Sequence, residues 1–128
     1  MSVPAPDRKG LGRAARMKES RDFARLKRDG KRLASGCLLA NWQIRPEALT
    51  SRLGVVTSRK LGNAVVRNRA RRLLREVFRS HRNELVPRVD LVLVARQSIV
   101  GKHFADVESD FLTMVRKAGL CQQLNRTG

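Results

Sequence analysis

Basic side chains that could bind phosphate are concentrated in one stretch of this 128-residue chain. Between residues 59 and 82 the sequence has nine lysines and arginines and a single acid, Glu76. Guanidinium groups bind phosphate oxygens through paired hydrogen bonds, and the amide of Asn68, set among these arginines, can bind a sugar, a base edge or a hydrated metal. Because one acid cannot pair with nine bases, a polyanion site is favoured over a solvated helix face.

The same stretch has the periodicity of an amphipathic helix. At about 100° per residue, one arc is predicted to face the core and contains Val66, Ala70, Leu73, Leu74, Val77 and His81. The opposite arc has Asn68 near its middle and carries Arg67, Arg71, Arg82, Arg75, Arg79 and Arg72, with Arg69 on the far flank. Before the helix, Ser58, Arg59, Lys60 and a turn at Gly62 add donors where free backbone N–H groups also favour anions.

The overall charge points to the same kind of partner. The formal net charge is +17 and the sequence pI is about 11.7, which fits either a nucleic acid or a membrane surface. Most of the surplus lies in two blocks, because residues 1–32 hold 11 bases and four acids and residues 59–82 hold nine and one. No apolar stretch is long enough to span a bilayer and no secretion signal is recognisable, so we expect a cytoplasmic protein without a membrane partner.

Both cysteines are expected to be reduced thiols. Cys37 and Cys121 are far apart and form no C-x-x-C pair, so neither a zinc ribbon nor a redox motif is indicated.

Three apolar stretches are predicted to form strands. They are 38–44, with Trp42 facing the core, 52–57, and 89–95, which is apolar enough to be buried on both faces. Short helical patterns flank them at 20–28, stopped by Gly30, and at 104–118, stopped by Gly119. This alternation predicts one mixed α/β domain around a single sheet.

A protein that cleaves RNA by itself would need clustered carboxylates or a histidine pair. Asp106, Glu108 and Asp110 alternate along a helix, so neighbouring members face apart, and a role at the helix N-terminus is favoured. His81 falls on the apolar arc and His103 precedes a helix, which indicates packing and capping. We therefore predict no catalytic residue and no metal site in the polypeptide.

One string of residues identifies a family. SRKLGNAVVRNRARRLLREVF, residues 58–78, resembles the signature of the protein subunit of bacterial ribonuclease P, centred on the R-N-R of residues 67–69. The segment RDFARLKRDGKR, residues 21–32, is also similar to the N-terminal part of that family. The resemblance runs from about residue 17 to residue 120, which implies a domain at 17–120 between a flexible basic tail at 1–16 and a polar tail at 121–128.

The family resemblance implies an α+β fold. It is a two-layer α/β sandwich with a four-stranded mixed sheet, and a left-handed βαβ crossover carries the R-N-R helix, as in a domain of a small-subunit ribosomal protein.

The resemblance also implies a function. The chain would be the RNA-binding subunit of a ribonucleoprotein endonuclease that removes the 5′ leader from precursor tRNA. The partner RNA would be the catalyst and would use Mg²⁺, and the protein would bind that RNA and the single-stranded leader and lower the magnesium requirement. No DNA partner is expected.

The implied site residues fall into two groups. RNA contacts are expected from Arg59, Lys60, Arg67, Asn68, Arg69, Arg71, Arg72 and Arg75. The leader-binding cleft is expected at Phe23, Lys27 and Asn41. Many relatives have a second aromatic where Lys27 stands and some have a tyrosine where Asn41 stands, so leader binding here is predicted to depend more on charge. From the residues alone, a packing role for Phe23 against the sheet, together with Leu26, is favoured over a role in leader binding.

One alternative stays open on composition alone. A ribosomal or other structural RNA-binding protein without a processing role would have the same charge, and only the resemblance separates the two.

Overall fold

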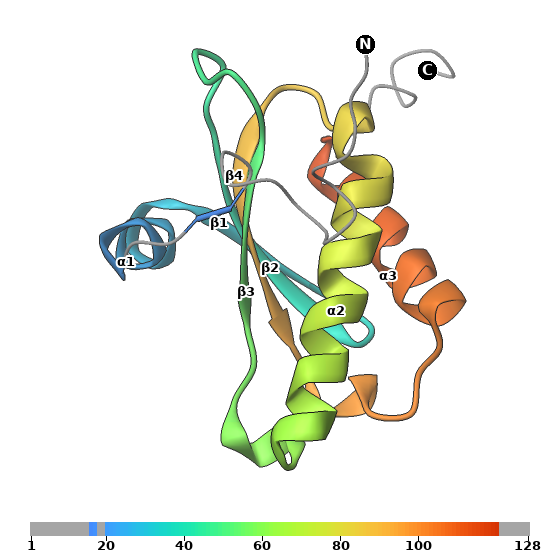
Figure 1. Cartoon of the computed structure of the whole chain (residues 1–128). Coiled ribbons are helices and arrows are strands. Elements are labelled where there is room, and N and C mark those ends of the chain that lie inside the picture. The colour runs from blue at the N-terminus through green and yellow to red at the C-terminus, as the bar shows by residue number, and fades with distance from the viewer. Residues whose placement is uncertain (1–15, 18–19, 121–128) are drawn as a thin grey trace, which may run out of the picture.

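The computed structural model describes residues 16–17 and 20–120, in which three α-helices and four strands form a single mixed sheet with its covering helices (Figure 1). The elements are α1 (Ser20–Asp29), β1 (Lys31–Ser35), β2 (Leu38–Ile44), β3 (Arg52–Val56), α2 (Ala64–His81), β4 (Val89–Ala95) and α3 (Phe104–Ala118). Short 3-10 turns lie at η3 (Arg59–Leu61), η4 (Arg82–Glu84) and η5 (Gln97–Ile99). The three predicted strands and three predicted helices are all confirmed, with bounds shifted by a few residues at most.

The sheet has the strand order β1-β2-β4-β3. β2 pairs antiparallel with both β1 and β4, whereas β3 pairs parallel with β4. The parallel pair is joined through α2, so the arginine-rich helix lies in a βαβ crossover, as predicted. β3 is an edge strand of this sheet, and its free edge borders the candidate site described below.

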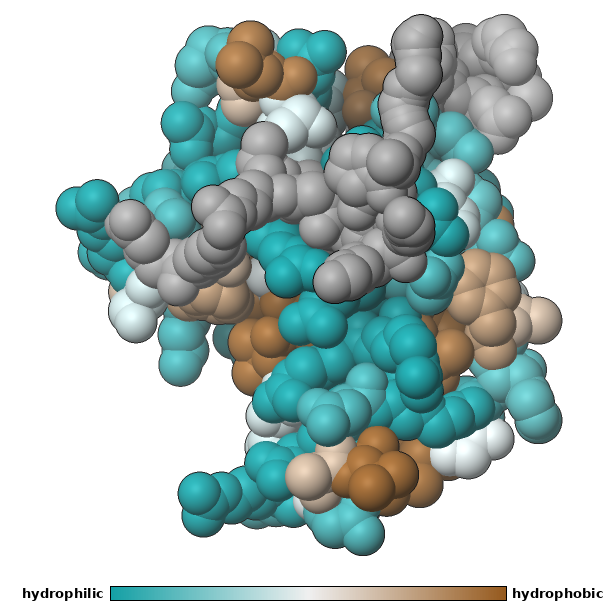
Figure 2. All heavy atoms as spheres, in the orientation of Figure 1, coloured by the Kyte–Doolittle hydropathy of each residue, from teal (hydrophilic) through white to brown (hydrophobic). Residues whose placement is uncertain are grey.

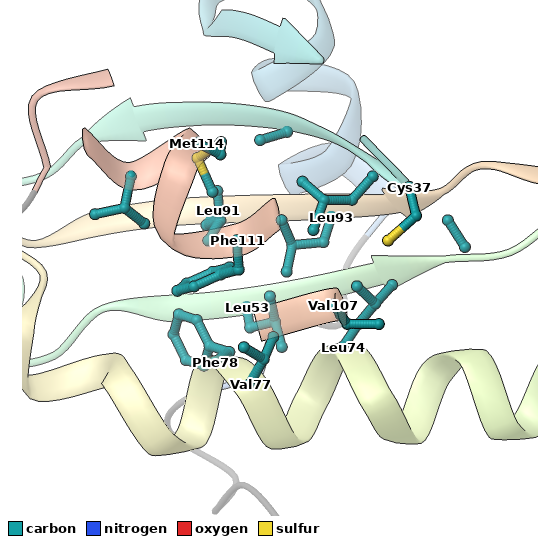
Figure 3. Packing of buried hydrophobic residues seen from close by; sticks show 14 of the residues in the cluster. Cys37, Leu53, Leu74, Val77, Phe78, Leu91, Leu93, Val107, Phe111 and Met114 are labelled. Atoms are coloured by element: carbon teal, nitrogen blue, oxygen red, sulfur yellow. The ribbon is translucent and has the colours of Figure 1, made fainter. Parts of the chain in front are cut away.

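The main core lies between the sheet and the layer formed by α2 and α3. Alternate strand residues, such as Leu91 and Leu93 of β4, face this layer, where Figure 3 shows them near Phe78 of α2 and Phe111 of α3. Trp42 is buried in the same core, as predicted. β4 is buried over nearly its whole length, which explains its continuous apolar sequence.

The buried arc of α2 is rotated slightly from the predicted one. Its fully buried residues are Ala70, Leu74, Val77 and Phe78, while Val66, Leu73 and His81 are half-buried. The prediction started its arc at Val66 and omitted Phe78, although Phe78 completes the i, i+4 pair with Leu74. Arg67 therefore lies at the edge of the buried arc rather than well out in solvent.

The opposite face of the sheet is covered in part by α1 (Figure 1). A second apolar cluster joins Met17, Leu26 and Val92, with Phe23 and Val94 packed against it. The α1 helix ends where the Gly30 N–H donates to the Leu26 carbonyl at 2.9 Å, which confirms the predicted stop. At Gly30 a Cβ atom would lie 2.7 Å from the carbonyl oxygens of Leu26 and Trp42, so the close approach requires glycine.

β1 was not predicted from the residues. Its sequence KRLAS has one large apolar residue, Leu33, and most of its residues are exposed, as expected for a strand at the edge of a sheet. Only the family resemblance, which implied four strands, accounted for it.

The two predicted tails fall almost wholly outside the described residues, together with Cys121, and so remain predictions. Arg16, the last residue of the predicted basic tail, forms an isolated parallel bridge with Leu53 of β3. This one residue is therefore part of the folded domain, because it pairs with the otherwise free edge of β3.

Candidate nucleic-acid interface

The N-terminal end of α2 is set by a tight turn. Gly62 has a φ of 147°, a region that favours glycine, and Asn63 caps the helix by accepting a hydrogen bond from the Val66 N–H at 3.1 Å. Buried Leu61 anchors the preceding 3-10 turn, which leaves Arg59 and Lys60 exposed. The two cations thus lie just before the first turn of α2, where the helix dipole also attracts anions.

The R-N-R residues point in three directions because successive helix residues are about 100° apart. Arg67 is half-buried and its Nε has no hydrogen-bond partner in the described part of the chain. Asn68 is exposed and its side-chain oxygen accepts from Arg71 at 2.8 Å. Arg69 donates to the Lys102 carbonyl at 2.7 Å, which ties α2 to the loop before α3. Only part of this motif is therefore free to move toward a ligand.

Most arginines of α2 lack a carboxylate partner. Over residues 16–17 and 20–120, the helix forms one Arg–carboxylate pair, between Arg79 and Glu76 at 2.7 Å. Arg72 is exposed, and Figure 2 shows hydrophilic side chains along much of α2. Burial, followed by the nearby charges of Arg16 and Arg71, lowers the pKa of Arg75. The surface therefore carries uncompensated positive charge, as the single acid in the sequence indicated.

The predicted leader-cleft residues all belong to the α1 side of the sheet. Phe23 is half-buried and packs so closely on β3 that a Cβ added to Gly54 would lie 2.6 Å from its ring. Lys27 is exposed on α1, one helical turn after Phe23. Asn41 alternates with core-facing Trp42 along β2 and is half-buried on the α1 side. Phe23 thus serves as the anchor expected from its spacing with Leu26.

The sequence reading missed an ionic cluster centred on Asp90. The Asp90 carboxylate accepts hydrogen bonds from Arg25 at 2.7 Å, from Arg45 at 3.1 Å and from Arg52 at 2.8 Å. Arg25 also donates to Gln43 at 2.8 Å and to Asp22 at 3.0 Å. Arg25 is therefore turned toward the sheet. The sequence did contain one sign of this cluster, because Asp90 is a lone acid near the start of an apolar strand. Burial of an unpaired carboxylate is costly, so a buried Asp90 needs cationic partners.

Opposing effects act on the Asp90 carboxyl. Burial alone would raise its pKa, but the hydrogen bonds and charge of Arg52, with the charges of Arg45 and Arg25, outweigh it, so the pKa is lowered. Asp90 is thus held ionised beneath α1.

The acids and histidines considered as catalysts have structural contacts instead. Asp106 accepts from the His103 N–H at 3.0 Å at the start of α3, and Asp110 accepts from the Cys37 N–H at 2.9 Å. His81 bonds to Glu108 at 2.7 Å and stacks on Phe111 with ring centroids 6.1 Å apart. The acids of α3 therefore point to different partners and form no shared site, as their alternation predicted.

Cys37 is not a reactive thiol. It is buried, and this burial together with the Asp110 carboxylate raises its pKa to about 12.

Neither a metal centre nor a membrane helix is found in the described residues. No group of three or more His, Cys, Asp or Glu side chains there could hold a metal ion. None of the helices between residues 20 and 120 combines the length and apolar character needed to cross a bilayer.

Known proteins resemble this chain over most of its length. The family model described as Ribonuclease P matches residues 11–119. The ribonuclease P protein component of Syntrophomonas wolfei is 36% identical over 110 residues, which cover 86% of this chain and 92% of that protein. That of Gluconacetobacter diazotrophicus is 38% identical over 109 residues, covering 84% and 94%.

Solved structures agree with the sequence comparison. The ribonuclease P protein of Staphylococcus aureus is similar with a TM-score of 0.76 and 28% identity, over 84% of this chain and 98% of that one. The ribonuclease P protein of Thermotoga maritima is similar with a TM-score of 0.72 and 27% identity, over 80% of this chain and 96% of that one. The chain therefore belongs to the ribonuclease P protein family, the protein subunits of the ribonucleoprotein endonuclease that forms the 5′ end of tRNA.

Proposed function

We propose that this protein binds RNA through two surfaces. The first, called the α2 arginine surface, binds the catalytic RNA and the precursor tRNA held against it, and consists of Arg59, Lys60, Arg67, Asn68, Arg69, Arg71, Arg72 and Arg75. The second, called the leader cleft, binds the single-stranded 5′ leader of precursor tRNA and contains Phe23, Lys27 and Asn41. Both surfaces border β3, so one RNA strand leaving the catalytic centre could reach the cleft.

The observation that carries this proposal is the unpaired charge of α2. Arg71, Arg72 and Arg75 have no carboxylate within ion-pair distance in the described residues, and Arg75 is crowded by other arginines. Such a surface is self-repelling in the free protein, and it is stabilised when phosphates replace its counterions. A purely structural reason for the arrangement is lacking, because acids at these positions would stabilise the helix better.

The leader cleft has little aromatic surface. Phe23 supplies one ring, whereas Lys27 and Asn41 supply a cation and an amide. Stacking contributes about 1–3 kcal/mol per base, so a cleft with one ring obtains less of its affinity from stacking. We infer that the leader is held mainly through its phosphates and with weak base preference.

The chemistry belongs to the partner RNA. The protein residues supply no catalytic group, and Mg²⁺ is held by the RNA with the protein lowering the concentration required. The protein lowers the Mg²⁺ requirement because its cations neutralise phosphates beside the catalytic centre. Without the protein, bound metal cations would have to neutralise the same phosphates. The complex would act in the cytoplasm, where precursor tRNA is made.

The test is cleavage of a precursor tRNA by the cognate RNA at low Mg²⁺, with and without the protein. We expect cleavage only when the RNA is present, and a lower Mg²⁺ requirement when the protein is added. Cleavage by purified protein alone, lost in Asp106→Asn or Asp110→Asn, would show instead a protein nuclease. Binding without any effect on cleavage would favour the alternative, a structural RNA-binding protein.

A further inference from the structure

A small cavity lies at the free edge of β3, between α1 and α2. Its volume is about 200 Å³, and it is lined by Arg16, Met17, Phe23, Leu53, Gly54, Val55 and Arg75. This space equals that of roughly seven water molecules in the liquid, enough for a phosphodiester group with part of its ribose. The cavity therefore connects the ring of the leader cleft with an arginine of the α2 arginine surface.

Backbone pairing brings Arg16 to this cavity. Arg16 bridges Leu53 in parallel, and the Met17 N–H donates to the Leu53 carbonyl at 2.8 Å. Met17 is 5% exposed and packs in the apolar cluster beneath α1. Side chains alternate along an extended segment, so Arg16 is directed away from that cluster and toward α2. The edge of β3 thus fixes a basic residue that the sequence placed in a flexible tail.

Arg16 and Arg75 lack a compensating acid. The Nε of Arg16 is buried and has no hydrogen-bond partner, and no ion pair of either residue is found in the described part of the chain. The two guanidinium groups are near enough for the charge of Arg16, after burial, to lower the pKa of Arg75. Two unpaired cations beside one cavity favour an anion between them.

Gly54 shapes the other wall of the cavity. A Cβ at this position would lie 2.6 Å from Cε1 and 2.7 Å from Cζ of Phe23, so any side chain would push the ring off the strand. With glycine the ring lies against β3, and the edge of the strand stays open toward Arg75.

We propose that Arg16 and Arg75 bind one phosphodiester of the single-stranded leader at the edge of β3, next to the ring of Phe23. This phosphate subsite rests on the proposed function and adds to it a residue, Arg16, outside both surfaces defined above. The subsite would hold one leader phosphate at a fixed position, which adds to the single aromatic contact that Phe23 offers the leader. The occupant is a phosphate rather than a base, because the polar groups of the cavity are two cations.

The test is a phosphate scan of the leader. Precursor tRNAs are prepared with one uncharged methylphosphonate at each leader position in turn, and their affinity for the assembled complex is measured with wild-type protein and with Arg16→Ala, Arg75→Ala and the double variant. In the wild type we expect a loss of about tenfold at one position. In the double variant that position should no longer matter, while the effects at other positions persist.

Arg116→Ala is the matched control, since it removes one arginine from the exposed face of α3. Its scan should match the wild type. Thermal unfolding of each variant checks the fold, and Arg75→Lys, which keeps charge but loses the paired donors, should retain part of the effect.

The outcomes separate the subsite from the proposed function. If the leader raises affinity but the double variant keeps the wild-type pattern at every position, the subsite is wrong and the proposed function stands. If the double variant weakens binding equally at all leader positions, the subsite is likewise wrong, because such a result reflects a general loss of positive charge and not one phosphate contact. If the leader adds no affinity to wild-type protein, leader binding itself fails and the subsite fails with it.

Discussion

The arginines around Asp90 and the arginines of α2 have the same side chain but opposite surroundings. Arg25, Arg45 and Arg52 converge on one carboxylate that is 1% exposed, at distances of 2.7 to 3.1 Å. On α2, Arg71, Arg72 and Arg75 have no acid within ion-pair distance in the described residues. The first group holds the fold together, and the second is available for a ligand.

Net charge therefore overstates the RNA-binding surface. Asp22 and Glu47 join Asp90 as partners of the cluster, with contacts to Arg25 at 3.0 Å and to Arg45 at 2.9 Å. Three acids face three arginines there, so the cluster adds almost nothing to the field outside the protein. Residues 59–82, by contrast, hold nine bases against one acid, and Arg16 adds a further unpaired cation near the edge of β3 in the described part of the chain.

The paired cluster also positions α1. Within this helix Leu26 is the one fully buried residue, so apolar packing alone is a small contribution. Arg25 links the helix to Asp90 of β4 and to Gln43 of β2. Because Phe23 and Lys27 flank Arg25 on α1, the geometry of the leader cleft depends on these ion pairs.

The largest expected effect comes from removing the centre of the paired cluster. Asp90→Asn leaves three arginines around a neutral amide and should lower the free energy of unfolding by about 3 kcal/mol, the low end for a broken buried pair. The low end applies because the arginine side chains are 26% to 32% exposed and can rehydrate. Chemical denaturation of wild type and variant measures it.

Acid titration provides a second check on Asp90. Its folded pKa is lowered from 3.8, so its stabilising effect is present above that value and is lost as pH falls through the folded pKa. The variant should lose part of this acid sensitivity. Equal stability of wild type and Asp90→Asn would mean that the cluster does not hold the fold.

A smaller effect is expected from one arm of the cluster. Arg25→Ala removes charge-assisted hydrogen bonds and should cost about 1.5 kcal/mol, together with part of the affinity for leader-bearing tRNA. Arg28→Ala is the control on the same helix, because its side chain is 70% exposed and its one ion pair among the described residues is with neighbouring Asp29. Unfolding curves and binding of tRNA with and without a leader distinguish them. Similar losses in both variants would contradict the assigned positioning role.

The sequence predicted the arginine helix well because periodicity and charge agree there. Glu76 was recognised as the single acid near nine bases, and the structure pairs it with Arg79. Trp42 was placed in the core from strand alternation alone. Each of these features is local, so neighbouring residues contain the necessary information.

The Asp90 cluster and the site at Arg16 are not local. Arg25, Arg45 and Asp90 are separated by 20 residues or more along the chain, and only sheet pairing brings them together. Arg16 falls in the basic tail predicted from the sequence, and it joins the folded domain through its bridge to Leu53. β1 was missed because an exposed edge strand lacks the apolar alternation that predicts strands.

On α2, arginine removal should affect binding without affecting the fold. Arg72→Ala removes an exposed, unpaired charge, so the free energy of unfolding should change by less than about 0.5 kcal/mol. RNA affinity should fall several-fold, and the slope of log affinity against log salt should become shallower by about 0.7 to 0.9 per lost phosphate contact. Salt titrations with cognate RNA measure this.

The two basic blocks, residues 1–32 and 59–82, together set the wild-type slope. With six to eight phosphates engaged we expect about −4 to −7, and a slope shallower than about −2 would mean that most of these charges are outside the interface. Arg116→Ala on α3 should leave the slope unchanged.

The last expected effect is at His81, whose ion pairs with two glutamates depend on pH and whose removal is not expected to change RNA binding. Burial opposes its charge, but hydrogen bonds to Glu108 at 2.7 Å and Glu84 at 3.2 Å outweigh burial and raise its pKa from 6.5. A raised folded pKa stabilises the protein below 6.5, and this stabilisation is lost as pH rises through the folded value. The free energy of unfolding should therefore fall by at most about 1 kcal/mol between about pH 6 and pH 8. In His81→Gln, which keeps a donor but cannot titrate, the unfolding free energy should vary less over this range. If both proteins follow parallel curves, the pairing of His81 with the two glutamates does not contribute to stability, and the contrast between paired and unpaired cations would rest on the Asp90 cluster alone.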